Sequence, residues 1–120
     1  MHLAEVIDLF LSLPETEETT PFGPDVLVYK VAGKMFSTAS PDDVPPRINL
    51  KCDPDRAVEL RDEHDAILPG YHMNKKHWNT VLIDESLPDS LLESIIRDSY
   101  ALVVNGLPKK DRERLSTIES

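Results

Sequence analysis

Residues 69–80 of the 120-residue chain form a short run in which side chains capable of binding chemistry are crowded together. The run reads PGYHMNKKHWNT and holds two of the four histidines and the only tryptophan, with two adjacent lysines and two asparagines. Lysine ammonium groups contact phosphates, asparagine amides hydrogen-bond to bases or sugars, and an indole can stack on a base. This mixture predicts a surface that meets a polar or anionic partner.

Metal binding and nucleophilic catalysis are weaker interpretations of the reactive side chains. Cys52, His64, His72 and His77 lack the ligand spacing of known zinc sites. Strand alternation places Cys52 on the same face as Ile48 and Leu50, so we interpret it as a buried hydrophobic residue and not as a nucleophile. The sequence has no G-x-S-x-G motif and no glycine-rich phosphate loop. We therefore expect no catalytic residue, no metal site and no cofactor, in a protein that is not an enzyme.

The charge of the chain is unevenly distributed. The net charge of −9 opposes simple coating of nucleic acid, because counterion release needs a basic surface. Segments 26–41, 44–52 and 66–83 nevertheless contain no acidic residue. They hold six basic residues: Lys30, Lys34, Arg47, Lys51, Lys75 and Lys76. A row of acids near the N-terminus could form a weak iron-binding ridge, although a solvated helix face is the commoner explanation. The row consists of Glu5, Asp8, Glu15, Glu17 and Glu18.

The elements that must position these residues are predicted from apolar spacing and turn signals. Helical spacing over residues 3–13 indicates an amphipathic helix and not a signal peptide. The other expected elements are strands over 26–32, 34–39, 47–52 and 78–84, a short strand over 67–71, and helices over 54–64 and 88–105. We interpret residues 15–20 as a polar link and residues 107–120 as a short helix or a frayed tail. Short turns between strands favour an antiparallel sheet in a single α+β two-layer domain covering residues 1–120.

Composition also bears on location and assembly. The single cysteine excludes an internal disulfide, which favours a cytoplasmic location. The longest apolar run, residues 100–104, is too short to span a bilayer, so we expect no membrane association. We expect a monomer, because no exposed apolar pattern is evident.

Two stretches resemble the signatures of the MmcQ/YjbR family. Residues 49–54 (NLKCDP), followed by Leu60-Arg61, resemble one signature, and residues 69–81 resemble the more specific one. Weaker blocks at residues 21–23, 30–36 and 98–103 keep the family's order. The resemblance implies a fold similar to the frataxin homologue CyaY, a twisted antiparallel sheet flanked by N- and C-terminal helices. It also implies DNA binding through a "double wing" of strands, and it supplies no catalytic residues.

We therefore predict weak, non-enzymatic DNA binding through a basic sheet face and the segment 72–79. Strict alternation places Arg47, Asn49 and Lys51 on the solvent-exposed face of their strand. The predicted contacts are Lys34, Arg47, Lys51, His72, Asn74, Lys75, Lys76, His77, Trp78 and Asn79. Trp78 would either stack on a base or buttress the segment. The alternatives are a protein-interaction or small-ligand-binding module, and frataxin-like metal handling.

Overall fold

The computed structural model describes residues 1–70 and 73–119 and shows four helices and six strands within them. The helices are α1 (Leu3–Ser12), α2 (Pro54–Glu63), α3 (Asp89–Asn105) and α4 (Lys109–Glu119). The strands are β1 (Thr16–Thr19), β2 (Leu27–Val31), β3 (Lys34–Ser40), β4 (Arg47–Lys51), β5 (Ile67–Pro69) and β6 (Trp78–Leu82). The expected α+β class is confirmed. Within the described ranges, no helix is long and apolar enough to cross a bilayer.

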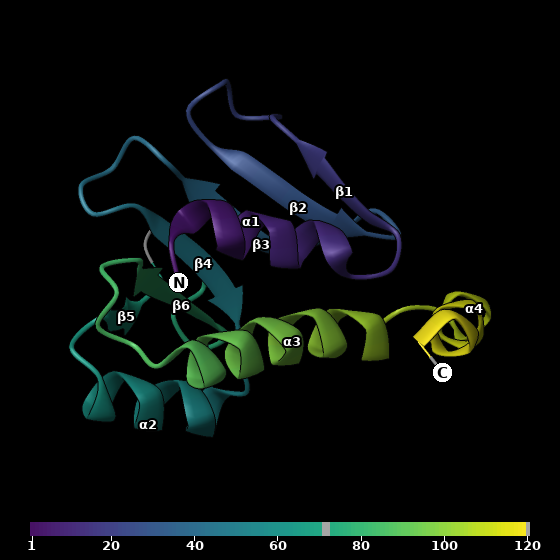
Figure 1. The fold of residues 1–120 in the computed structure, drawn as a ribbon. Coiled ribbons are helices and arrows are strands. Elements are labelled where there is room, and N and C mark those ends of the chain that lie inside the picture. The colour runs from purple at the N-terminus through teal and green to yellow at the C-terminus, as the bar shows by residue number, and fades with distance from the viewer. Residues whose placement is uncertain (71–72, 120) are drawn as a thin grey trace.

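The strands form one antiparallel sheet in the order β1-β2-β3-β4-β6-β5. β5 precedes β6 in the chain but lies outside it, so β1 and β5 are the two edge strands (Figure 1). α1 packs on β1, α3 crosses β3 and β4, and α2 covers β5 and β6. This order brings the start of β6 next to the end of β4, with Trp78 opposite Lys51.

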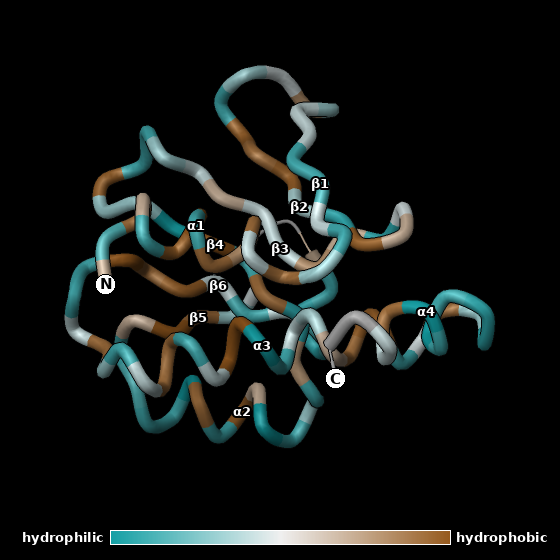
Figure 2. The backbone as a smooth tube through the Cα atoms, turned by 45° about the vertical axis from the view of Figure 1, so that its right-hand side comes forward, coloured by the Kyte–Doolittle hydropathy of each residue, from teal (hydrophilic) through white to brown (hydrophobic). Residues whose placement is uncertain are grey.

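The two faces of the sheet differ sharply. On β4, Ile48 and Leu50 are buried towards the helices, and the alternate residues are only partly buried, as the sequence predicts. Hydrophobic stretches run along β4, β5 and α3 (Figure 2). The core draws on these stretches and on α1, whose Phe10 ring centroid lies 4.7 Å from that of Tyr29. The helices therefore cover one face of the sheet, and the other face carries the alternate, more polar residues.

The local signals for α2 and α3 act as the sequence indicates. Asp53 caps α2, its Oδ2 accepting the Arg56 N–H at 3.3 Å, and Pro54 is the first helical residue. α3 ends at Asn105 as predicted, but Gly106 has φ −89° and not the left-handed conformation common after helices. A glycine at position 106 is thus not required by backbone geometry.

The prediction for residues 15–20 was wrong. Residues 16–19 are not a polar link but strand β1, antiparallel to β2. No apolar alternation marks this strand, because it lies at the edge of the sheet and its residues are partly buried or exposed. The Tyr29 hydroxyl donates to Glu18 at 2.7 Å and so joins β1 to β2 by side chains as well as backbone.

Ser99 on α3 joins two strands where their pairing ends. β3 and β4 pair from Ser40–Arg47 to Ser37–Leu50, and Phe36 and Lys51 lie just beyond. The fully buried Ser99 hydroxyl accepts the Lys51 N–H at 2.8 Å and donates to the Phe36 carbonyl at 2.6 Å. A single side chain of α3 therefore satisfies one backbone group of each strand.

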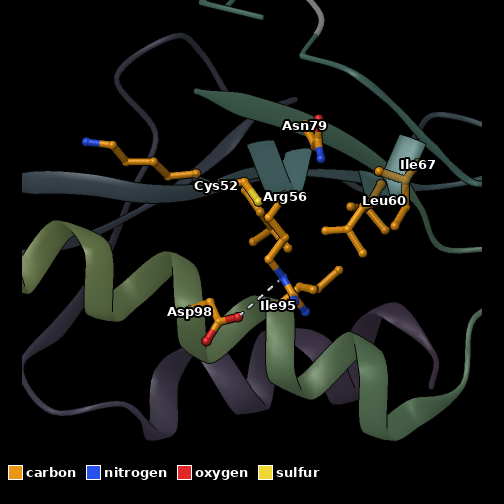
Figure 3. A pocket seen from close by; sticks show the side chains of 10 residues that line it. Cys52, Arg56, Leu60, Ile67, Asn79, Ile95 and Asp98 are labelled. Carbon is orange, nitrogen blue, oxygen red and sulfur yellow. Dashed lines mark ion pairs between the residues drawn. The ribbon is translucent and has the colours of Figure 1, made fainter. Parts of the chain in front are cut away.

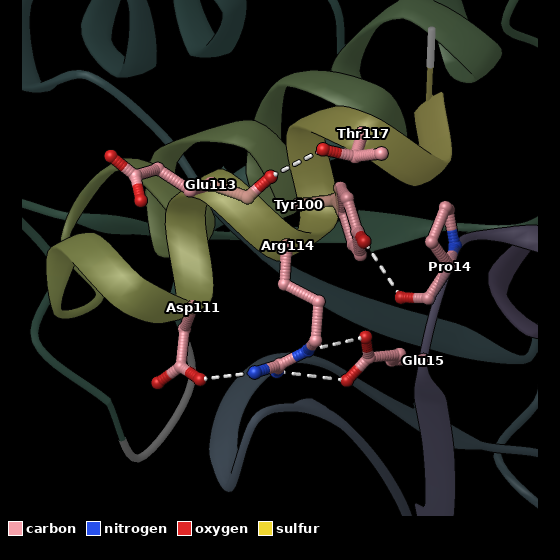
Figure 4. A network of polar contacts seen from close by, with 7 residues as sticks. All are labelled: Pro14, Glu15, Tyr100, Asp111, Glu113, Arg114 and Thr117. Atoms are coloured by element: carbon pink, nitrogen blue, oxygen red, sulfur yellow. Dashed lines mark hydrogen bonds and ion pairs between the residues drawn. The ribbon is translucent and has the colours of Figure 1, made fainter.

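The C-terminal helix is held against the start of the chain by a polar network (Figure 4). Arg114 makes a two-pronged contact with Glu15, at 2.8 and 2.9 Å, and donates to Asp111 at 2.6 Å. The Tyr100 hydroxyl donates to the Pro14 carbonyl at 2.7 Å beside it. Leu115 of α4 is fully buried, and residues 109–119 form a helix and not a frayed tail.

Candidate functional site

The sheet face opposite the helices carries a ladder of polar side chains across its centre. Thr38, Asn49 and Thr80 are register partners on β3, β4 and β6. The Asn49 Nδ2 donates to Thr38 Oγ1 at 2.9 Å, and the Thr80 Oγ1 donates to Asn49 Oδ1 at 2.6 Å. An amide has two donors and two lone pairs on its oxygen, so these bonds among the described residues leave one N–H and one lone pair of Asn49 for a ligand.

A hollow of about 670 Å³ lies over this face. Thr38, Ser40, Arg47 and Asn49 line it from the strands, together with the partly buried Met35. The other lining residues come from loops: Phe22 and Val26 from the β1–β2 connection, Asp43 from the β3–β4 connection, and Met73. Phe22 is 74% exposed although it is a large aromatic residue. Apolar side chains around a few polar groups are typical of ligand sites, and the volume suits a small organic ligand.

Lysine residues gather at one end of this face. Lys51 and Trp78 are cross-strand partners, and alternation along β4 and β6 puts both on the same face as Asn49 and Thr80. Lys75 and Lys76 are exposed in the turn that leads into Trp78. Among the described residues, no acidic group pairs with Lys51, Lys75 or Lys76 within 4.0 Å, so their charges are available to a partner.

Local hydrogen bonds fix the shape of the lysine turn. The Asn74 Oδ1 accepts the Lys76 N–H at 2.9 Å, and the Asn74 carbonyl accepts the His77 N–H at 3.2 Å. The Arg61 guanidinium of α2 donates to the Lys75 carbonyl at 3.1 Å. Asn74 therefore acts first as a turn residue, which is a frequent use of asparagine.

Gly70 allows the strand that carries Trp78 to approach closely. Its N–H donates to the Trp78 carbonyl at 2.9 Å. A Cβ at position 70 would lie 2.8 Å from the Trp78 carbonyl oxygen and 2.9 Å from the Trp78 Cβ, which is too close for any side chain. Glycine at this position thus sets where the partly buried indole stands.

Three other predicted contacts lie in different surroundings. Arg47 lines the hollow but is 3.2 Å from the Asp43 carboxylate, so its charge is already partly balanced. Lys34 is exposed at the β2–β3 turn, at the same end of the sheet as Lys51. His77 is partly buried, and its carbonyl accepts the Cys52 N–H at 2.8 Å. His72 lies outside the described residues.

Asn79 does not belong to the predicted surface. It pairs with Leu50, faces the helices and is 2% exposed. Its Nδ2 donates to the Ala57 carbonyl of α2 at 3.4 Å, and its Oδ1 has no hydrogen-bond partner in the described part of the chain. The sequence run suggested one continuous polar surface, but alternation within β6 sends Trp78 and Asn79 to opposite faces.

Cys52 lies in a second cavity, between the sheet and helices α2 and α3 (Figure 3). This cavity of about 10 Å³ is lined largely by apolar groups such as Leu60 and Ile95, and it has room for about one water molecule. Burial raises the pKa of the Cys52 thiol, which is 8% exposed. The raised pKa keeps the sulfur protonated and works against a role as nucleophile.

The acidic residues near the N-terminus do not form a metal-binding cluster. Glu15 is engaged by Arg114, Glu18 by the Tyr29 hydroxyl, and Glu5 by the His2 N–H at 3.1 Å. Among residues 1–70 and 73–119, no group of three or more histidine, cysteine or acidic side chains could hold a metal ion.

Comparison with known proteins places the chain in a family. The family model described as YjbR matches residues 11–102. The chain belongs to the YjbR family. The protein YbdF of Escherichia coli O157:H7 is 45% identical over 107 residues, covering 89% of this chain and 88% of its own length. YjbR of Escherichia coli K12 is 32% identical over 115 residues, covering 96% and 98%.

Solved structures of similar proteins have the same fold as this YjbR-family chain. A crystal structure of a Deinococcus radiodurans protein with a DUF419 domain superposes with a TM-score of 0.89 at 39% identity, covering 96% of this chain and 88% of that one. A crystal structure of a Pseudomonas syringae protein gives a TM-score of 0.75 at 30% identity, with coverages of 85% and 98%. These comparisons show the family and the fold, and they indicate no ligand or activity.

Several residues of the site could not be selected from the sequence. Phe22 and Met73 both line the hollow although 50 residues separate them in the chain, and no local pattern links them. Thr38 and Thr80 look like ordinary strand residues. Their polar side chains within otherwise buried strands were the one available signal, because a buried polar group needs a partner.

Proposed function

We propose that this YjbR-family protein is a non-enzymatic protein that binds nucleic acid weakly on the uncovered face of its sheet. The observation that carries the proposal is the pairing of Lys51 with Trp78 on that face, beside the Lys75–Lys76 turn. Ammonium groups next to an aromatic face suit a phosphate backbone and an adjoining base. The net charge of −9 keeps the interaction weak, micromolar at best in physiological salt.

We also propose that the protein is not an enzyme, because its reactive side chains are buried or already hydrogen-bonded. Cys52 is buried with a raised thiol pKa. The hydroxyls of Thr38 and Thr80 are both bonded to Asn49, the first as an acceptor and the second as a donor, and an amide is not a general base. These observations favour ligand binding over catalysis on this face.

A fluorescence anisotropy titration of labelled oligonucleotides across salt concentrations tests the proposal. The double variant Lys75→Glu with Lys76→Glu is expected to weaken binding at least about tenfold and to reduce the magnitude of the salt slope by about 1–2, because two phosphate contacts are lost. The matched control is Lys109→Glu with Lys110→Glu. It makes the same charge change on another adjacent, exposed lysine pair, at the start of α4.

Two results would count against the proposal. If the unchanged protein shows no saturable binding even at low salt, nucleic acid is not its ligand. If both double variants weaken binding equally, only the net charge matters and the sheet face has no special role.

The hollow favours a second candidate function, binding of a small ligand or a protein segment. The observation that supports this second function is the exposed Phe22, which lines a hollow of about 670 Å³. Frataxin-like metal handling has no comparable support, because the described acidic residues are dispersed. Titration of ferrous iron with calorimetry would revive that rival only if saturable binding is lost on neutralising Glu15, Glu17 and Glu18.

A further inference from the structure

We propose that the hollow over the sheet receives one unstacked nucleobase, so that the protein prefers single-stranded to double-stranded nucleic acid. This inference rests on the proposed function and adds to it the part of the ligand that enters the hollow. It follows from three properties of the hollow: apolar walls, a polar floor, and a basic end.

The walls suit a flat ring. Phe22 and Val26 stand on one loop, Met35 rises from β3, and Met73 comes from the segment before β6. An aromatic ring and thioether groups make favourable contacts with a π-system. Phe22 is 74% exposed and is free to lie against such a ring. A purely aliphatic ligand would leave the polar floor beneath these walls unsatisfied.

The floor suits the edge of a base. Asn49 keeps one N–H and one lone pair after its bonds to Thr38 and Thr80. An asparagine amide is the side chain that matches the donor and acceptor pattern on a base edge, as in its bidentate contact with adenine. The two threonines hold the amide in a fixed orientation, so little conformational freedom is lost when a ligand binds.

The basic end suits the phosphate that the base brings with it. Met35 of the hollow is the register partner of Lys30, and β4 leads from Asn49 to Lys51 at the end where Lys75 and Lys76 stand. A strand whose base lies on Asn49 thus has its backbone within reach of these lysines. In a duplex the bases are paired and stacked and cannot enter, which makes single strands the expected ligand.

The experiment compares three labelled probes of equal length: a single strand, its duplex, and an abasic strand that keeps every phosphate but has no bases. The single strand is expected to bind about tenfold more tightly than the abasic strand, since stacking of one base contributes on that scale. Phe22→Ala should remove this difference without changing binding of the abasic strand. The matched control is Val44→Ala, which truncates a residue that is 94% exposed on the neighbouring loop and does not line the hollow.

Each outcome bears on one proposal at a time. Equal binding of the single and abasic strands, with the lysine variants still weakening both, overturns the base-binding hollow and leaves the proposed phosphate contacts standing. No binding of any probe overturns the proposed function. Binding of a free 5′-mononucleotide as tight as that of the strand would make a free nucleotide, and not a nucleic acid, the occupant. Because Phe22 is exposed, circular dichroism of Phe22→Ala is expected to match that of the unchanged protein.

Discussion

Replacing Ser99 by alanine should destabilise the protein far more than the loss of one hydroxyl suggests. The hydroxyl is fully buried and bonds the Lys51 N–H and the Phe36 carbonyl, one backbone group on each of two strands. Leaving a buried polar group without a partner costs about 1–3 kcal/mol. Lys51 is partly reached by water and Phe36 is fully buried, so we expect a loss of about 2–4 kcal/mol in the free energy of unfolding.

Urea unfolding followed by circular dichroism measures this loss. With a slope of about 2 kcal/mol/M, the midpoint should fall by about 1–2 M urea. Ser94→Ala is the matched control, because Ser94 is exposed on the same helix and alanine is the better helix former by at most about 0.7 kcal/mol. A midpoint for Ser99→Ala within the error of the Ser94→Ala midpoint would refute the reasoning that this hydroxyl joins the two strands.

Two further predictions concern the C-terminal helix and the Trp78 strand. The hydrogen bonds from Arg114 lower the pKa of the Glu15 carboxyl in the folded protein. The ion pair therefore stabilises the fold fully above the ordinary glutamate pKa of about 4.3. This stabilisation is lost as the pH falls through the lowered pKa of the folded state. Glu15→Gln should therefore lower the melting temperature at neutral pH, and the difference should close on acidification; a gap that persists in acid would contradict the ion-pair explanation. Gly70→Ala should cost about 1–3 kcal/mol and shift the Trp78 fluorescence, because a Cβ there meets the Trp78 backbone. Gly106→Ala, where the nearest atom would be 3.5 Å away, should be tolerated, and equal losses in both variants would rule out the steric argument.

Much of the fold was accessible from the sequence because its central elements carry strong local signals. The alternation of β4 separates Ile48 and Leu50 from Asn49 without exception. The Asp53–Pro54 pair marks the start of α2. These signals arise locally, because each element buries one face or needs a cap at its end. They can therefore be recognised in the sequence even when the partner elements are not known.

The parts that escaped prediction depend on partners distant in the sequence. β1 is a strand because β2 offers it an edge, not because of its own composition. Asn79 was assigned to the surface because its neighbours are polar, whereas the register with Leu50 places it under α2. Phe36 faces the helices because the β2–β3 register shifts between Tyr29 and Lys30, an irregularity with no signal in the sequence.

The edges of the sheet bear on how any macromolecule can approach it. β1 presents two exposed acidic residues, Glu17 and Glu18, and β5 has only three residues and ends in Pro69, which has no N–H to offer. Short, charged or proline-containing edges resist the addition of a foreign strand. Growth of the sheet by β-augmentation, and with it edge-to-edge aggregation, is therefore opposed at both ends. A partner is directed instead to the broad side of the sheet, where recognition depends on side chains and not on backbone pairing.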